Sequence, residues 1–175
     1  MLGQHKKDLA IVQYNPAWAD LFELEAESLL DALGDNVLSI EHIGSTSIPG
    51  LAAKPIIDIM IAADSLEKAT ELIPTMEEIG YEYRPHDPIP GRRFFVKESS
   101  PEVRTHHANL TTLDSLFWRN QILFRNYLRT HDQLASEYAD LKIRIAEHNA
   151  QSHQIDPNAK TEFVSRVLEL AEGEE

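Results

Sequence analysis

The apolar positions along the chain change period several times, and each change predicts a new element. Apolar residues recur at helical spacing after Pro16, and Gly34 follows the last of them, which predicts a helix between these two residues. Short apolar runs at residues 9–14, 37–43 and 55–62 are bounded by Gly, Pro, Asn and Ser residues and predict strands. The first third of the chain is therefore expected to alternate strands and helices.

The middle of the chain continues this alternation. Asp64 and Glu67 have the spacing of a capping box, which predicts a helix that begins there and ends before Gly80. Residues 93–97 and 103–111 are predicted to form a pair of antiparallel strands.

From residue 114 onward the apolar spacing is helical. We expect an α/β fold in which helices pack on a mixed sheet and a helical C-terminal region follows. The whole chain, residues 1–175, is predicted to be one domain, with an α/β part at 9–111 and a helical region at 114–171. The predicted helices of this region span residues 117–128, 133–148 and 157–170.

One charged residue interrupts the apolar strand at 55–62. Alternate residues of a strand face opposite sides, so Ile57, Ile59 and Ile61 share one face while Asp58 and Met60 share the other. A buried carboxylate costs several kcal/mol unless it is paired, hydrogen-bonded or metal-bound. We therefore expect a polar neighbour for Asp58.

The strand at 103–111 offers two sets of polar neighbours. His107 and Asn109 face one side and His106 faces the other. If this strand lies near Asp58, one of the two sets joins it. Adjacent histidines of a strand face opposite sides, so His106 and His107 are not expected to hold one metal ion together.

A Gly-Ser turn precedes the strand of Asp58. Glycine lets the backbone approach a phosphate closely and serine adds a hydroxyl donor, so Gly44, Ser45 and Thr46 are candidate phosphate-binding residues. Lys54, just ahead of the strand, is a further candidate, although an exposed lysine is an equally good interpretation. Twelve residues separate Ser45 from Asp58, and this order of turn, strand and aspartate is the pattern of the nucleotidyltransferase superfamily.

Composition and charge narrow the class of ligand. The chain has 175 residues, 42% of them hydrophobic, no cysteine and a formal net charge of −13. That charge opposes binding to a long nucleic acid. Between residues 84 and 107 there are five basic residues against three acidic ones, so this segment could attract an anion, with Arg93 as a candidate. Neither a leader sequence nor a membrane span is recognisable, so we expect a cytoplasmic protein.

Several segments together resemble the GrpB family. The resemblance implies a nucleotidyltransferase-like fold, in which a Gly-Ser turn holds triphosphate and paired acids on the next strand bind divalent metals. GrpB proteins also occur fused to dephospho-CoA kinase, but the family's reaction is not established. The matching segments are YNPAW at 14–18, IEHIGSTSIPGL at 40–51, KPIIDI at 54–59, GRRFF at 91–95, RTHH at 104–107 and FRNYLR at 124–129.

The chain departs from the active superfamily pattern at its metal site. Met60 stands where the second acid is expected, and His107 and Asn109 stand where the third is expected. Asp58 is then the single clear metal ligand, with Glu41 as a candidate substitute. Two-metal transfer needs several carboxylates. We therefore expect Mg²⁺ or Mn²⁺ to bind weakly and only together with a phosphorylated substrate.

Three interpretations stay open on the sequence. Asp58, Glu41 and His107 are candidate catalytic residues of a nucleotidyl- or phosphoryl-transfer enzyme that acts on a small phosphorylated substrate or nucleotide. The same groups are also compatible with a noncatalytic module that binds a nucleotide, a CoA-type ligand or a protein partner. In the third interpretation Asp58 and His107 are structural. No membrane partner is expected.

Overall fold

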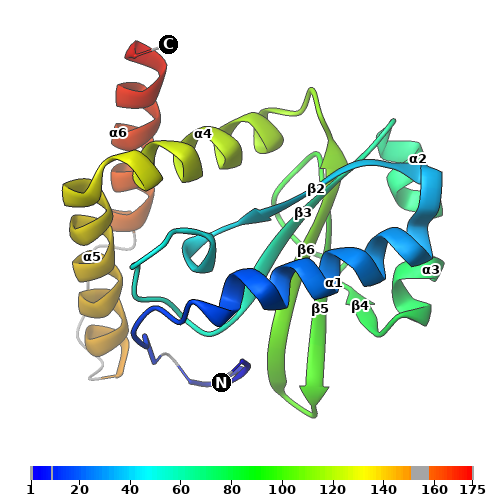
Figure 1. Cartoon of the computed structure of the whole chain (residues 1–175), viewed down its shortest axis with the longest axis horizontal. Helices are drawn as coiled ribbons and strands as arrows, with labels where there is room; N and C mark the ends of the chain where they lie inside the picture. Colours follow the sequence, from blue (N-terminus) through cyan, green and yellow to red (C-terminus); the bar gives the residue numbers. More distant parts are fainter. Residues whose placement is uncertain (1, 9, 151–157, 175) are drawn as a thin grey trace.

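A mixed sheet forms the centre of the molecule (Figure 1). The computed structural model describes residues 2–8, 10–150 and 158–174. The strand order is β2-β3-β6-β5-β4, with β1 also paired to β6; β3 and β6 run parallel, and the other pairs are antiparallel. The strands are β1 Gln4–His5, β2 Val37–Ile43, β3 Ile57–Ala63, β4 Tyr81–Tyr83, β5 Arg93–Ser100 and β6 Val103–Thr112.

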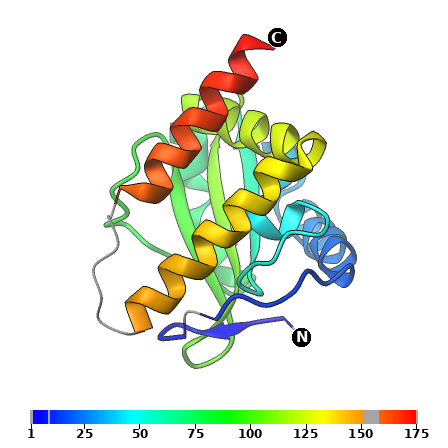
Figure 2. The same cartoon turned by 90° about the vertical axis from the view of Figure 1, so that its left-hand side faces the viewer.

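Helices lie on both sides of this sheet. The helix α1 and the short helices α2 and α3 pack on one side, and α5 and α6 lie in front of the sheet in Figure 2. The fold is thus the α/β arrangement with a helical C-terminal region that the sequence predicts. The helices are α1 Ala17–Leu33, α2 Leu66–Glu71, α3 Ile73–Glu78, α4 Leu116–Thr130, α5 Asp132–Ala150 and α6 Ala159–Gly173.

The main core lies between α1 and one face of the sheet. Ile57, Ile59 and Ile61 of β3 are fully buried there, together with Trp18 and Leu29 of α1. Apolar side chains at alternate positions of β3 therefore fill the core, as the alternation predicts. Residues at the intervening positions of β3 face the helical region instead.

A second core joins the helical region to the segment that follows β2. Ile48 and Leu51 pack there against side chains of α4, α5 and α6. In addition, Arg129 of α4 donates from Nε and Nη2 to the carbonyl oxygen of Ser47, at 3.0 and 2.7 Å. The helical region thus holds the Gly-Ser turn in place.

The structure corrects several predicted elements. Of the strand predicted at 9–14, residue 9 lies outside the described residues, and the described residues 10–14 form no strand, although Val12 makes an isolated antiparallel bridge to Ala53. The predicted helix before Gly80 is two helices, α2 and α3, because Pro74 in the first turn of α3 lacks the N–H that a continuous helix needs. Its N-cap is Ser65, whose hydroxyl accepts from the amide of Lys68 at 3.1 Å, rather than Asp64.

Other boundaries agree more closely. The strand predicted at 37–43 is β2, and the antiparallel pair predicted at 93–97 and 103–111 is β5 and β6, each slightly longer than expected. The two shortest strands, β1 and β4, are not predicted. Pro157, where the last helix was predicted to begin, lies outside the described residues. No described helix is both long and apolar enough to cross a membrane.

Candidate functional site

The Gly-Ser turn and Asp58 are in direct contact. Ile43, the last residue of β2, pairs with Asp58, and Gly44 follows with a φ of 70°. A Cβ atom added to Gly44 would lie 2.9 Å from Cβ of Asp58, closer than real Cβ atoms come. Position 44 therefore requires glycine for two reasons: its φ is positive, and the Asp58 side chain occupies the space that a Cβ atom would need.

His107 lies beside Asp58 on the neighbouring strand. The parallel register pairs these residues, and His107 Nδ1 lies 3.1 Å from Asp58 Oδ1. A carboxylate can only accept a hydrogen bond, so Nδ1 of His107 donates it. Nε2 of His107 is buried and has no hydrogen-bond partner among the described residues. The side chains of Asp58 and His107 are 33% and 22% exposed, so a ligand can reach both, and the hydrogen bond fixes the orientation of the Asp58 carboxylate.

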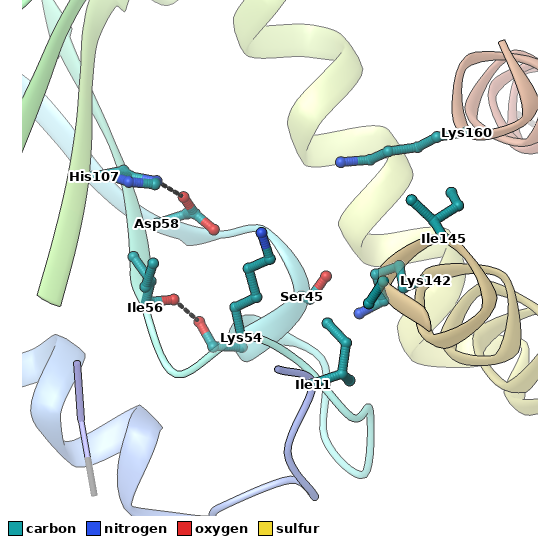
Figure 3. Close-up of a pocket in the computed structure, with 11 residues that line it drawn as sticks. Ile11, Ser45, Lys54, Ile56, Asp58, His107, Lys142, Ile145 and Lys160 are labelled. Atoms are coloured by element: carbon teal, nitrogen blue, oxygen red, sulfur yellow. Dashed lines mark hydrogen bonds and ion pairs between the residues drawn. The ribbon is translucent and has the colours of Figure 1, made fainter. Parts of the chain in front are cut away.

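A cavity of about 320 Å³ opens in front of this pair (Figure 3). Lys54, Lys142 and Lys160 approach it from three segments, namely the loop before β3, α5 and α6. None of these lysines forms an ion pair with a carboxylate in the described part of the chain. The other lining residues are Ile11, Ser45, Thr46, Ile56, Asp58, His107, Ile145 and Ala146.

Two lysines of this cavity, Lys54 and Lys142, have lowered pKa values. Burial lowers the pKa of Lys142 to about 7, and the charge of Lys160 acts in the same direction while Asp58 opposes it. Partial burial and Lys160 likewise lower the pKa of Lys54. The Lys142 Nζ donates to the carbonyl oxygen of Ala52 at 2.7 Å. Because the ammonium groups repel one another, an anion bound between them would be stabilised.

A second cavity, of about 500 Å³, lies on the other side of Asp58 and His107. It shares Ser45, Asp58, His107 and Lys160 with the first, so the two form one cleft between the sheet and the helical region. Its walls are mainly aromatic and amide side chains: Phe94, Phe117, Phe124, Tyr138, Asn109, Asn120 and Gln121.

Three predicted site residues are not available to a ligand in this cleft. Arg125 holds Glu41 in an ion pair at 2.7 Å, and Glu41 lines a different cavity, next to α1. Arg93 Nε donates to the hydroxyl of Thr70 on the core side of the sheet, so Arg93 lines neither cavity. The third, Thr46, lines the cleft, but the residue is only 2% exposed and its hydroxyl donates to the carbonyl oxygen of Ile56.

The local excess of basic residues is also not what makes the cleft positive. Arg92 does line the second cavity, but its guanidinium donates to Asp87 at 2.8 and 2.9 Å and to Asn109. Similarly, Lys97 pairs with Glu25 at 2.7 Å on the opposite side of the sheet. The positive charge of the cleft instead comes partly from Lys142 and Lys160, which lie on helices of the C-terminal region. Sequence reasoning missed these two because nothing distinguishes them from other polar positions of amphipathic helices.

The residues around Asp58 do not fit a resident pair of metal ions. Met60 is fully buried at the position of the second acid. Asn109 is also occupied, since its Nδ2 donates to the carbonyl oxygen of Ile59 at 3.0 Å. No group of three or more His, Asp or Glu side chains among the described residues is arranged to hold a metal ion. One carboxylate is too few for a two-metal mechanism.

Comparison with known proteins places the chain in a family. The family model described as GrpB protein matches residues 8–170. UPF0157 protein YqkA of Bacillus subtilis (strain 168) is 37% identical over 166 residues, which cover 95% of this chain and 48% of YqkA, so the chain spans about half the length of that relative.

Solved structures agree with this assignment. Conserved protein GrpB from Enterococcus faecalis superposes with a TM-score of 0.81 at 38% identity, covering 94% of this chain and 98% of that one. The Cid1 poly(U) polymerase bound to MgGTP gives a TM-score of 0.52 at 14% identity, covering 75% of this chain and 43% of Cid1, a likeness of fold alone. The chain therefore belongs to the GrpB family, and its fold is nucleotidyltransferase-like.

Proposed function

We propose that the cleft binds the phosphate groups of a small phosphorylated molecule of the nucleotide class. The observation that carries this proposal is the convergence of Lys54, Lys142 and Lys160 on one cavity without a carboxylate partner among the described residues. In a chain with a net charge of −13, acidic partners are abundant, so three unpaired lysines in one cavity favour an anionic ligand.

The polar groups at the cavity mouth suit a phosphate. The Ser45 hydroxyl lines both cavities and has no hydrogen-bond partner within the described residues, so it can donate to a phosphate oxygen. Lys54 and Lys160 supply positive charge from opposite walls, and a lysine ammonium is a common phosphate partner. The second cavity, with Phe94, Phe117 and several side-chain amides, is suited to the nucleoside portion of such a ligand.

The contact between Asp58 and His107 favours a second candidate function, transfer of the bound phosphoryl or nucleotidyl group. In that reaction Asp58 takes the proton of an attacking hydroxyl group, whose oxygen bonds to phosphorus as the leaving phosphate departs. His107 keeps the Asp58 carboxylate in one orientation. The residues do not hold metals by themselves, and we propose that Mg²⁺ or Mn²⁺ binds weakly, together with the ligand's phosphates.

Thermal unfolding with and without phosphorylated metabolites tests the binding proposal. A ligand at 100 times its Kd stabilises the native state by about 2.7 kcal/mol. For a chain of this size each kcal/mol raises Tm by roughly 2–4 °C. Lys160→Ala and Ser45→Ala should reduce the rise, whereas Arg93→Ala, on the core side of the sheet, should not. If no nucleotide or CoA compound at millimolar concentration raises Tm, the proposal is wrong.

The transfer reaction is tested separately, by release of phosphate or pyrophosphate from nucleotides with Mg²⁺ or Mn²⁺. Release that Asp58→Asn abolishes, while the nucleotide still raises Tm, would support an enzyme. A rise in Tm without any release would favour the noncatalytic alternative, a nucleotide- or CoA-binding module or one that also binds a protein partner.

A further inference from the structure

Lys142 differs from the other two lysines of the cavity in its surroundings. Lys54 and Lys160 are more exposed than Lys142, which is partly buried on α5 with its Nζ over the ring of Tyr138, 4.9 Å from the centroid. Ile145 and Ala146 of the same helix and Ile11 line the cavity around it. The amine group of Lys142 therefore faces the cavity from an apolar wall.

Burial favours the neutral amine of Lys142, whereas the ring of Tyr138 favours the ammonium. The hydrogen bond to the carbonyl oxygen of Ala52 uses a single N–H, and no carboxylate pairs with the ammonium among the described residues. The positive charge of Lys160, on α6, also disfavours the ammonium form of Lys142. The carboxylate of Asp58, on β3, favours the ammonium form, but its effect is smaller than that of burial. At neutral pH a substantial share of Lys142 is thus unprotonated, and an unprotonated lysine amine is a nucleophile.

We propose that Lys142 is a nucleophilic amine that forms an imine with the carbonyl group of a phosphorylated aldehyde or ketone bound in the cavity. The inference rests on the proposed function, because Ser45, Lys54 and Lys160 hold the phosphate of that ligand. The volume of about 320 Å³ accommodates a small phosphorylated ring or sugar.

The reaction is a condensation without any change of oxidation state. The Lys142 nitrogen lone pair attacks the carbonyl carbon, and the C–O π electrons move to oxygen, which takes up a proton to give a carbinolamine. Nitrogen gives up one of its two protons, which balances the one that oxygen has taken. The hydroxyl then takes up a second proton and leaves as water while the nitrogen lone pair forms the C=N bond, and the iminium releases its remaining N–H proton to give the imine. Lys160, across the cavity, is placed to supply the proton that the departing oxygen needs.

Pyridoxal 5′-phosphate is a suitable probe, because it carries an aldehyde and a phosphate. The intact protein is incubated with the probe, reduced with borohydride to trap the imine, digested and analysed by mass spectrometry. We expect the adduct on Lys142 with about tenfold preference over Lys54 or Lys160, and pyridoxal without the phosphate to label it about tenfold less. ATP should protect Lys142 by occupying the phosphate site. Lys142→Arg, which keeps the positive charge but cannot form the imine under these conditions, should lose the adduct while unfolding at a similar temperature.

The outcomes separate this inference from the proposed function. If nucleotides raise Tm but the adduct spreads over surface lysines or falls on Lys160, the imine is wrong and phosphate binding stands. If pyridoxal and its phosphate label Lys142 equally and nucleotides leave Tm unchanged, phosphate binding is wrong, and the inference falls with it because it requires the phosphate. Persistence of the same level of labelling in Lys142→Arg would also overturn it.

Discussion

Two acid–histidine pairs occupy opposite faces of β6, one residue apart. On the core side, His106 Nε2 lies 4.0 Å from Glu25 of α1; on the cleft side, His107 lies 3.1 Å from Asp58 of β3. The residue types are alike, but the exposed fraction of the acid differs, at 12% for the Glu25 side chain and 33% for Asp58. The two pairs therefore differ in the other groups that contact each carboxylate, and these contacts determine whether a pair is structural or part of a binding site.

Glu25 is fully engaged by the protein. It accepts from Lys97 at 2.7 Å and from the hydroxyl of Tyr81 at 2.9 Å. Burial alone would raise the pKa of Glu25, but Lys97, His106 and Tyr81 together lower it below its usual value. On the cleft side the positive charges come from lysines that have no such partner among the described residues. A paired network is structural, whereas unpaired charges around an accessible carboxylate indicate a binding site.

The largest loss of stability is expected from a substitution at Gly44, where the Gly-Ser turn contacts Asp58. Gly44→Ala introduces a Cβ against Asp58 at a positive φ, which combines backbone strain with overpacking and should destabilise the protein by about 4 kcal/mol. Gly50→Ala is the matched control, since φ is 79° but nothing lies within 4 Å of the added Cβ, and it should cost about 1 kcal/mol. Equal losses in denaturant unfolding would mean that Gly44 and Asp58 are not in contact.

The second prediction compares the loss of stability when Glu25 or Asp58 is replaced by its amide. Glu25→Gln leaves Lys97 without its charge partner beneath α1 and should lower the free energy of unfolding by about 3 kcal/mol. Asp58→Asn should change it by less than about 1 kcal/mol, because surface-accessible pairs contribute little. The same unfolding experiment measures both variants, and a larger loss for Asp58→Asn would indicate that the cleft pair is structural.

A smaller, pH-dependent effect is expected at Lys142. Its pKa in the folded protein is about 7 against an ordinary 10.5, so between these values the unfolded chain binds a proton that the folded chain has released. Stability should therefore rise with pH across this window, by at most about 1.4 kcal/mol per pH unit.

Lys142→Met removes this slope. The variant should be more stable than the parent protein at pH 7, and its advantage should shrink as the pH rises toward 10. Lys68→Met, at an exposed and paired lysine, serves as the control for loss of a surface lysine. An advantage that does not change with pH would contradict the account of Lys142.

The sequence predicts those features of the site that depend on local pattern. The alternation in β3 separates Asp58 from the isoleucines of the core, and the spacing between Ser45 and Asp58 indicates the turn that contacts the carboxylate. Alternation also places Arg92 and Arg93 on opposite sides of the chain, but it cannot say which side faces the cleft.

Features that depend on packing between distant segments cannot be predicted from the sequence pattern. Lys142 and Lys160 reach the cavity because α5 and α6 pack on the second face of the sheet, which periodicity within each helix does not reveal. Likewise, the excess of basic residues around Arg92 disappears once Asp87 binds its guanidinium. A local count of charges misjudges the site, because ion pairs form in three dimensions.

Calorimetric titration of the protein with ATP in the absence of divalent metal tests the central claim, that unpaired lysines make the cleft a phosphate site. We predict binding that weakens as salt increases, and a loss of about tenfold in affinity for each of Lys54→Gln and Lys160→Gln. Lys7→Gln, at an exposed lysine that lines neither cavity of the cleft, should leave the affinity unchanged. Absence of binding, or an equal loss in all three variants, would contradict the claim.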